Sequence, residues 1–433
     1  DYLERLNPAQ RLAAEFGEHR DGSTFASGPL LVIAGAGTGK TMTLAHRVAH
    51  LVIEGVSPER ILLLTFTRRA AQEMTRRVEN IVRVSARDAV PLPSGGLPWS
   101  GTFHSIANRL LRRFAHNLGL DPGFSVLDRG DAADMLDVVR HEQKLSRTAR
   151  RFPKKDTCLA IYSRCVNTQQ PLSTTLEHHY PWCADWTSEL SELFRHYVER
   201  KQQSQSLDYD DLLLYWSHLV AEAEFAEELG SWFDHVLVDE YQDTNVIQAE
   251  ILNALKPDGR GVTVVGDDAQ SIYSFRAAEV ENILGFPDQY IPSARVITLE
   301  KNYRSTQAIL DAANGLIAES ERQYRKNLFS EQTPGDKPRY VTVEDGDAEA
   351  EYVVEAILEN REQGMQLKVQ SVLFRGSHHS DRLELELVRR YIPYVPYGGR
   401  KFRDAGHVKV RLCLISWALY AGKEVAGCRV VSG

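Results

Sequence analysis

The residues best suited to chemistry form a glycine-rich stretch from Leu30 to Thr41, which reads LLVIAGAGTGKT. Its apolar start predicts a buried strand, and a helix-forming run follows the glycines at Lys40. Backbone amides of such a loop can surround a phosphate, and the helix N-terminus adds partial positive charge. Lys40 would reach the outer phosphates of a nucleoside triphosphate, and the Thr41 hydroxyl would bind Mg²⁺.

One position departs from the general phosphate-loop pattern, because Ala34 stands where the first glycine is expected. A strand-to-helix turn that needs glycines for its backbone would explain the stretch without a ligand, but Gly-Lys-Thr in this frame favours phosphate binding. The predicted nucleotide-binding residues of this stretch are Ala34, Gly35, Ala36, Gly37, Thr38, Gly39, Lys40, Thr41 and Met42.

Two adjacent carboxylates follow another predicted strand, in the stretch HVLVDEYQDTN at 235–245. Asp239 would hold the Mg²⁺ shell, and Glu240 would polarise an attacking water. Acidic pairs also occur at helix starts because they complement the helix dipole. Beside a phosphate loop, the catalytic interpretation is the stronger one.

Polar residues also occupy three other ends of predicted elements. Gln270 lies in VTVVGDDAQSIYSFRAA (262–278), where a strand's carboxyl end would face the γ-phosphate. Arg304 lies in RVITLEKNYRST (295–306) as a candidate cation for the transferred phosphoryl group. Gln10 falls in the first turn of a helix that Asn7 and Pro8 begin, and its amide could read an adenine edge.

Aromatic residues beside cations are typical of single-strand binding, because bases stack on rings while cations hold phosphates. Phe66 and Thr67 end the predicted strand ILLLTFT and precede two arginines, although an ordinary solvated helix start explains them equally well. Tyr273, Phe275 and Arg276 share one loop, with core packing as the competing interpretation. His104 follows a short predicted strand, and a lone histidine there is more often structural.

These residues belong to an α/β fold, because buried strands alternate with helices before and after the middle of the chain. We predict a phosphate-loop motor domain with a parallel sheet in two parts, 1–109 and 201–294, separated by a helical insertion at 110–200. Residues 140–155 of the insertion are basic, which indicates a solvated face or an arm that touches nucleic acid. A second domain should occupy 295–433.

Composition bounds the function classes. The 433 residues are 43% hydrophobic and carry a net charge of −8, which argues against a protein coated in nucleic acid but permits a locally positive channel. The five cysteines form no CxxC pair, so neither a disulfide framework nor a zinc site is indicated. Without a run of eighteen apolar residues or a signal peptide, we expect a soluble protein of the cytoplasm.

Taken in order, the stretches resemble successive motifs of the UvrD/Rep/PcrA branch of superfamily 1 DNA helicases. The resemblance rests on LNPAQ, AGAGTGKT, TFTRRAAQEM, GTFHS, VDEYQDTN, GDDAQSIYSFRAA and LEKNYRST. Ala34 is the residue that this branch normally carries. A weaker resemblance continues through 372–402, which is similar to the second RecA-like motor domain.

The resemblance implies an ATP- and Mg²⁺-dependent helicase or translocase that moves 3′ to 5′ on single-stranded DNA. Gln10 would read adenine, Tyr303 would stack on it, and Arg304 would act as an arginine finger. Gln270 would couple the γ-phosphate to the DNA platform. The residues implied to hold DNA are Phe66, Thr67, His104, Tyr273, Phe275 and Arg276.

The chain departs from the family pattern at several positions. Met42 replaces an arginine that sandwiches adenine in many relatives, so base selectivity would rest on Gln10 and Tyr303. Arg68 and Arg69 replace Asn-Lys, and two alanines, Ala269 and Ala277, replace an Asp and a Gly.

The family's Gly-Leu-Glu motif and second arginine finger do not occur before Gly433, so we expect an incomplete second domain and weaker catalysis. Residues 403–433 resemble the stretch that leads into the family's large inserted subdomain.

The expected function is therefore DNA unwinding or translocation in repair or replication, on single strands and at junctions with duplex, by a monomer or weak dimer. One alternative is the motor subunit of a RecB/AddA-like helicase–nuclease. Another is a DNA translocase or anti-recombination protein that moves without unwinding.

Overall fold

The computed structural model describes residues 2–20, 24–85, 96–148 and 150–397. The chain divides into two compact units, Asp1–Lys337 and Pro338–Gly433. Within the described ranges, no helix is long and apolar enough to cross a membrane. The stretch 403–433, on which the resemblance to an inserted subdomain rests, lies outside the described residues.

A six-stranded sheet organises the first unit, with the strand order β10-β3-β9-β8-β4-β5 and every neighbouring pair parallel. The predicted buried strands are confirmed, since all residues of the four central strands are buried. Parallel sheets covered on both faces read as continuous apolar runs, which is why these strands were recognisable. The strands are β3 (Leu30–Ala34), β4 (Ile61–Thr65), β5 (Ser100–Thr102), β8 (His235–Val238), β9 (Val262–Gly266) and β10 (Arg295–Leu299).

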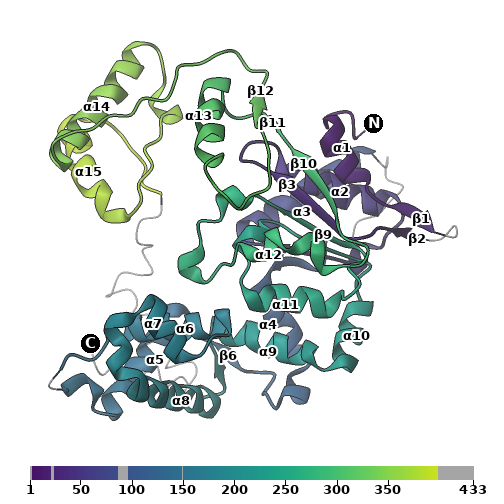
Figure 1. The fold of residues 1–433 in the computed structure, drawn as a ribbon, viewed down its shortest axis with the longest axis vertical. Coiled ribbons are helices and arrows are strands. Elements are labelled where there is room, and N and C mark those ends of the chain that lie inside the picture. Colours follow the sequence, from purple (N-terminus) through teal and green to yellow (C-terminus); the bar gives the residue numbers. More distant parts are fainter. Residues whose placement is uncertain (1, 21–23, 86–95, 149, 398–433) are drawn as a thin grey trace. The chain divides into compact units, whose positions relative to one another are not determined.

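Alternate side chains of each strand enter two separate cores. Leu30 and Val32 pack with α1 (Pro8–Glu15), α2 (Lys40–Ile53) and α3 (Arg68–Ser85) on one face. Leu31 and Ile33 enter the opposite core, whose helices are α4 (Phe103–Arg113), α9 (Tyr209–Ala221), α10 (Ala223–Ser231), α11 (Val246–Leu255) and α12 (Glu281–Leu284). Figure 1 shows α2 and α11 on opposite sides of the strands. The strands' carboxyl ends therefore meet at one edge, where ligands of such sheets bind.

The segment predicted as a helical insertion contains α5 (Arg129–Glu142), α6 (Lys155–Thr168), α7 (Leu172–His179) and α8 (Thr187–Gln203). A short parallel pair, β6 (Ser125–Val126) with β7 (Ser206–Leu207), joins its entry to its exit. At this exit Lys201 is buried between two carboxylates, with Nζ 2.8 Å from Asp208 and 2.7 Å from Asp211. The ion pairs fix the chain's return to the sheet.

The domain boundary predicted at 294–295 differs from the structure. Strand β10 pairs with β3 as the edge strand of the first sheet, so residues 295–299 belong to the first unit. The first unit also holds β11 (Lys301–Asn302), α13 (Gln307–Ile317) and β12 (Phe329–Ser330). A local pattern identifies a strand but not its long-range neighbour, so the pairing of β10 with β3 could not be predicted from the sequence. The first unit is completed by a short antiparallel ribbon of β1 (Glu18–Arg20) and β2 (Thr24–Ala26).

The described part of the second unit contains α14 (Gly346–Glu362) and α15 (Ser380–Arg389). These helices pack through a small apolar core that includes Val354, Leu383 and Leu387. Asp345 caps α14 by accepting hydrogen bonds from the backbone of Asp347 and Ala348.

Candidate functional site

The phosphate loop connects β3 to α2 with the geometry expected of a ligand cradle. Gly37 and Gly39 have φ values of 82° and 88°, in the left-handed region that glycine tolerates best. A Cβ on Gly39 would lie 2.6 Å from Gln10 Nε2, and one on Gly37 would lie 2.7 Å from Arg304 Cβ. The loop therefore needs glycine both for its backbone and for the side chains that approach it.

Gln10 touches the phosphate loop directly, because its Nε2 donates to the Thr38 carbonyl at 2.8 Å. Its Oε1 accepts the Asn7 amide at 3.0 Å, while the Asn7 side chain accepts the Gln10 amide, so the two residues form a capping box. The sequence predicts Asn7 as the N-cap, without a capping role for Gln10. The Asn-x-x-Gln spacing already contained the signal for the pair.

The acid pair lies beside the phosphate loop, as predicted. Lys40 Nζ lies 2.9 Å from Glu240 Oε2, although the two residues are far apart in sequence. Glu240 has a φ of 51°, a strained left-handed conformation that points to a functional requirement. Asp239 is 6% exposed, and burial together with the Glu240 charge raises its pKa to about 7. A buried carboxylate at this position suits a cation ligand, since a divalent ion would compensate the charge.

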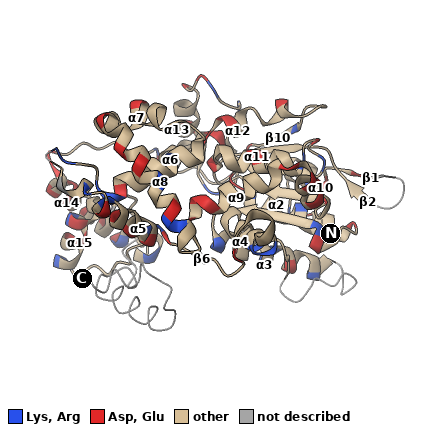
Figure 2. Ribbon diagram, turned by 90° about the horizontal axis from the view of Figure 1, so that it is seen from below, with Lys and Arg blue, Asp and Glu red and all other residues tan. Residues whose placement is uncertain are grey.

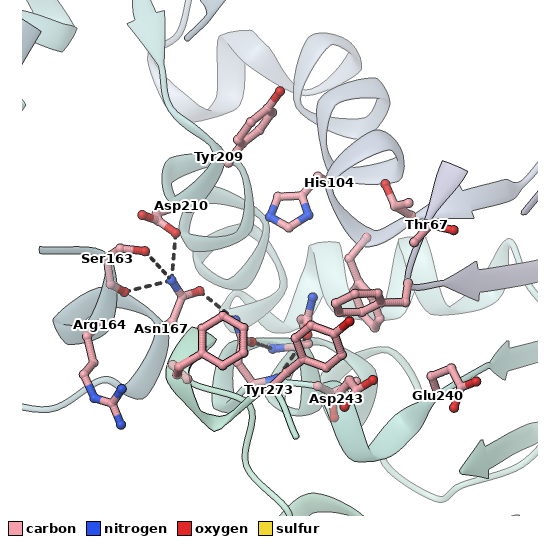
Figure 3. Close-up of a pocket in the computed structure, with 18 of the residues that line it drawn as sticks. Thr67, His104, Ser163, Arg164, Asn167, Tyr209, Asp210, Glu240, Asp243 and Tyr273 are labelled. Atoms are coloured by element: carbon pink, nitrogen blue, oxygen red, sulfur yellow. Dashed lines mark hydrogen bonds between the residues drawn. The ribbon is translucent and has the colours of Figure 1, made fainter. Parts of the chain in front are cut away.

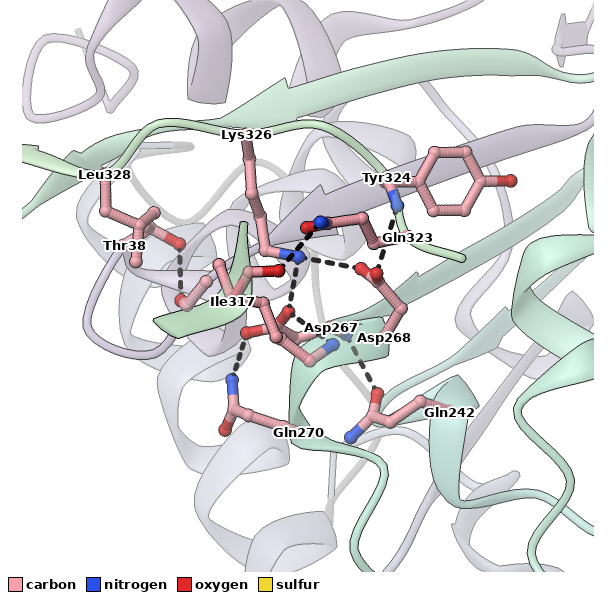
Figure 4. A network of polar contacts seen from close by, with 12 residues as sticks. Thr38, Gln242, Asp267, Asp268, Gln270, Ile317, Gln323, Tyr324, Lys326 and Leu328 are labelled. Atoms are coloured by element: carbon pink, nitrogen blue, oxygen red, sulfur yellow. Dashed lines mark hydrogen bonds and ion pairs between the residues drawn. The ribbon is translucent and has the colours of Figure 1, made fainter. Parts of the chain in front are cut away.

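Gln242 joins this pair to a polar network around the loop after β9, and Figure 4 shows that network from Gln242 onward. Gln242 donates from Nε2 to Glu240 at 2.9 Å and accepts the Asp267 amide at 3.0 Å. Asp267 in turn accepts a 2.5 Å hydrogen bond from Gln270 Nε2. Gln270 is thus connected to Glu240 through two residues, the Gln242 side chain and both the amide and the carboxylate of Asp267.

Lys326 completes the network and was not anticipated. Its Nζ lies 2.8 Å from Asp267 and 2.7 Å from Asp268, and all three side chains are nearly inaccessible to solvent. Leu328 follows on the same segment, and a Cβ on Gly35 would meet its side chain at 2.7 Å. No local pattern distinguishes Lys326 from the neighbouring Arg322 and Arg325, because its partners lie far away in sequence.

The residues after β10 also contact the phosphate loop. Asn302 donates from Nδ2 to the Ala36 carbonyl at 2.6 Å, and the Tyr303 amide donates to the Gly37 carbonyl at 2.9 Å. The Tyr303 hydroxyl accepts from Asn7 at 3.0 Å, with the ring half exposed. Arg304 follows with an exposed side chain. The structure thus gathers Gln10, Tyr303 and Arg304 around one loop.

A pocket of about 620 Å³ lies between the sheet's carboxyl edge and the insertion (Figure 3). One wall carries three aromatic rings, since Phe66 and Tyr273 have centroids 5.0 Å apart and Tyr273 and Phe275 have centroids 5.7 Å apart. Thr67 and His104 also line it, so five of the predicted DNA-binding residues meet in one place. The side chain of Arg276, the sixth, lies outside the described residues.

The opposite wall of the pocket was not predicted from the sequence. Tyr209 lies edge-on to His104 in this wall, with 5.7 Å between the ring centroids. The insertion contributes Arg129, Arg164 and Tyr180 to the lining. Burial, with a smaller effect of the Arg68 charge, lowers the pKa of His104 to about 4, so the ring is neutral near neutral pH.

The basic stretch 140–155 makes many of its ion pairs within the insertion. Arg140 pairs with Asp137, Arg150 with Asp185, and Lys155 with Asp134. Figure 2 shows acidic residues among the basic ones around α5 and α8. The pairing favours the solvated-face interpretation of this stretch over a free basic arm.

Comparison with known proteins agrees with this geometry. The family model described as "UvrD/REP helicase N-terminal domain" matches residues 17–291. The chain belongs to the UvrD/REP helicase family. The model described as "UvrD-like helicase C-terminal domain" matches residues 297–432, so both parts of the chain have counterparts among UvrD-like helicases.

Relatives within the UvrD/REP helicase family include proteins named ATP-dependent DNA helicase PcrA. The one from Staphylococcus epidermidis is 34% identical over 408 residues, which cover 94% of this chain and 54% of that protein. The one from Staphylococcus aureus is 33% identical over 409 residues, with the same shares of 94% and 54%. The chain therefore spans about half the length of the curated relatives that it matches.

Proposed function

We propose that this UvrD/REP family chain is the motor of an ATP-dependent DNA helicase or translocase that acts on single-stranded DNA and at its junctions with duplex. The observation that carries the proposal is the pocket in which aromatic rings and the carboxylates Asp239 and Glu240 share one lining. A strand held on the rings would lie next to the groups that hydrolyse the nucleotide. Such proximity is what coupling between the two ligands requires.

The nucleotide end of the proposal rests on the phosphate loop. Lys40 and the amides of Gly37 and Gly39 would bind the phosphates. Arg304, on the segment after β10, would approach the γ-phosphoryl group that is transferred. Gln10 and Tyr303 would hold the base, and Met42 is exposed in the first turn of α2. Because Oε1 of Gln10 already accepts from Asn7, base recognition would use the second N–H of the amide or the second lone pair of Oε1.

The hydrolytic step would be performed by Glu240, which accepts the proton of the attacking water. Thr41 and Asp239 are the oxygen donors that fit Mg²⁺, and a bound Mg²⁺ would neutralise charge on the phosphates. Gln270 would shift from Asp267 to the γ-phosphate and so report its presence to the loop that carries Tyr273 and Phe275.

The pocket's charges favour one orientation of the strand. Asp210, Asp239, Glu240 and Asp243 lie in the lining and would repel phosphates. Bases would therefore face Phe66, Tyr273 and Phe275, with phosphates toward arginines such as Arg164. Contacts of this kind read no base edges, so sequence preference should be weak.

Direction and pathway belong to the proposal as well. By analogy with the family, movement would be 3′ to 5′, in DNA repair or replication, by a monomer or weak dimer in the bacterial cytoplasm. Strand displacement by the full chain on duplexes with a 3′ or a 5′ single-stranded tail tests this. We expect ATP-dependent displacement from the 3′-tailed duplex. Equal displacement from both duplexes would contradict the direction, and translocation without displacement would favour the non-unwinding alternative.

A further inference from the structure

The insertion contacts the motor sheet's loops through one face of α6. Arg164 donates from Nη1 to the carbonyl of Ser274, between the platform residues Tyr273 and Phe275, at 3.3 Å. Asn167 follows on the same helix and is 7% exposed. Residues three apart on a helix share a face, so the two side chains form one contact surface.

Asn167 uses both ends of its amide to join three elements. Its Nδ2 donates to Asp210 Oδ1 in α9 at 2.7 Å and to the Ser163 carbonyl of α6 at 2.8 Å, as Figure 3 shows. Its Oδ1 accepts a 2.6 Å hydrogen bond from Asn245 Nδ2. Buried polar groups that are satisfied in this way specify one arrangement, because losing a partner leaves an uncompensated group.

Asn245 belongs to the loop that carries the catalytic carboxylates. It caps α11, with its side chain accepting the Gln248 amide at 2.9 Å, and a single short turn separates it from Glu240. Its carbonyl accepts from Asn282 at 3.1 Å, which ties the same loop to the residues after the aromatic platform. Asn245 thus lies where the loops after β8 and β9 meet.

Four of these residues, here called the junction, also line the pocket. Its lining includes Arg164, Asn167, Asp210 and Asn245 in addition to the rings and the carboxylates. A strand in the pocket would therefore contact the junction, and a shift of α6 would be transmitted through Asn167 to the loop of Glu240.

We propose that Asn167 is a positioning residue through which the helical insertion makes ATP hydrolysis respond to DNA. The proposal rests on the proposed function, since it concerns the coupling of the same two sites. It assigns to the insertion a part in hydrolysis, in addition to any contact with DNA.

Asn167→Leu tests the proposal, because leucine has a similar size and lacks all the hydrogen bonds. We expect DNA-stimulated kcat to fall about 10-fold, within the range of coupling between sites, while basal kcat and KM for ATP stay within about twofold. The matched control is Lys155→Met at the start of α6, which removes a surface ion pair with Asp134 and should leave stimulation unchanged.

Exchanging the side chains of positions 167 and 210 keeps the net charge and separates loss of the contact from loss of folding. In the double variant Asn167→Asp, Asp210→Asn, the hydrogen bond between the two positions reverses its donor, and residue 167 still accepts from Asn245. We expect this variant to recover most of the stimulation that Asn167→Asp alone loses. Equal proportional losses of basal and stimulated rates in Asn167→Leu, or a folded exchange variant without recovery, would overturn the proposal.

The two failures can be told apart. If the unaltered chain shows no DNA-stimulated hydrolysis, the proposed function fails. If the unaltered chain is stimulated and Asn167→Leu is stimulated equally, only the role of Asn167 fails.

Discussion

Lys40 Nζ lies 2.9 Å from Glu240 Oε2, so one ammonium joins the phosphate-loop helix to the loop after β8. In the proposed function the same ammonium serves the phosphates. A γ-phosphate would therefore compete with Glu240 for Lys40, and Glu240 would be released as a base when the nucleotide arrives.

Glu240→Gln should separate ATP binding from hydrolysis. The variant removes the carboxylate that competes for Lys40, so we expect equal or tighter ATP binding in a fluorescent-nucleotide titration. Hydrolysis should fall by about 10²–10⁴-fold, the usual contribution of a general base. Lys368→Ala, at an exposed lysine of the second unit, serves as the control. Markedly weaker ATP binding by Glu240→Gln would argue against the competition.

Lys326→Met should destabilise the first unit strongly. It would leave the buried carboxylates of Asp267 and Asp268 without their cation, and breaking a buried ion pair typically costs about 3–5 kcal/mol. Urea denaturation measures the free energy of unfolding. The matched control is Lys301→Met, whose exposed partner Glu331 predicts a loss of about 1 kcal/mol or less. Similar losses in both variants would refute the importance of the buried cluster.

His104 should make stability depend on pH below neutrality. Its folded-state pKa of about 4 lies below the ordinary value of 6.5, so the unfolded chain binds the proton first and stability falls as pH drops through this window. His235, whose pKa burial also lowers to about 4, adds to the same loss. Denaturation of the unaltered chain and His104→Gln near pH 7.5 and pH 5 isolates the His104 share. An identical pH effect in both proteins would contradict the assignment.

Tyr273→Ala should weaken single-stranded DNA binding without abolishing it. Tyr273 stands between Phe66 and Phe275 in the aromatic wall, and stacking on one ring contributes about 1–3 kcal/mol. Fluorescence anisotropy with a labelled oligothymidylate measures the affinity. Trp182, which is exposed on the insertion outside the pocket lining, offers the control Trp182→Ala. An equal effect of both substitutions would place the strand elsewhere.

Much of the first unit was predictable because its four central strands are short, mostly apolar and fully buried, and polar residues follow soon after them. The phosphate loop, the acid pair and the aromatic loop each carry a local signal of this kind. The sequence could not place β10 beside β3, since parallel pairing joins distant segments. Strand β10 therefore lies in the first unit, past the boundary expected at 294–295, although the strand itself was predicted.

The residues that hold the site's loops in place were harder to predict from the sequence. Lys326 and Asn167 act through partners that fold to them from afar, and neither stands in a recognisable spacing. The basic residues of 140–155 gave a strong compositional signal, yet pairs such as Arg140 with Asp137 neutralise part of it. Composition gives the number of charged residues, but their ion-pair partners become known only from the fold.

In the proposed function the aromatic pocket and the acid pair form one coupled site. The decisive measurement is steady-state ATP hydrolysis by the unaltered chain with and without single-stranded DNA. We expect the hydrolysis rate to rise with DNA and to saturate at the concentration where DNA binding saturates, and we expect a smaller rise in Tyr273→Ala. A hydrolysis rate that is the same with and without DNA would refute the coupling.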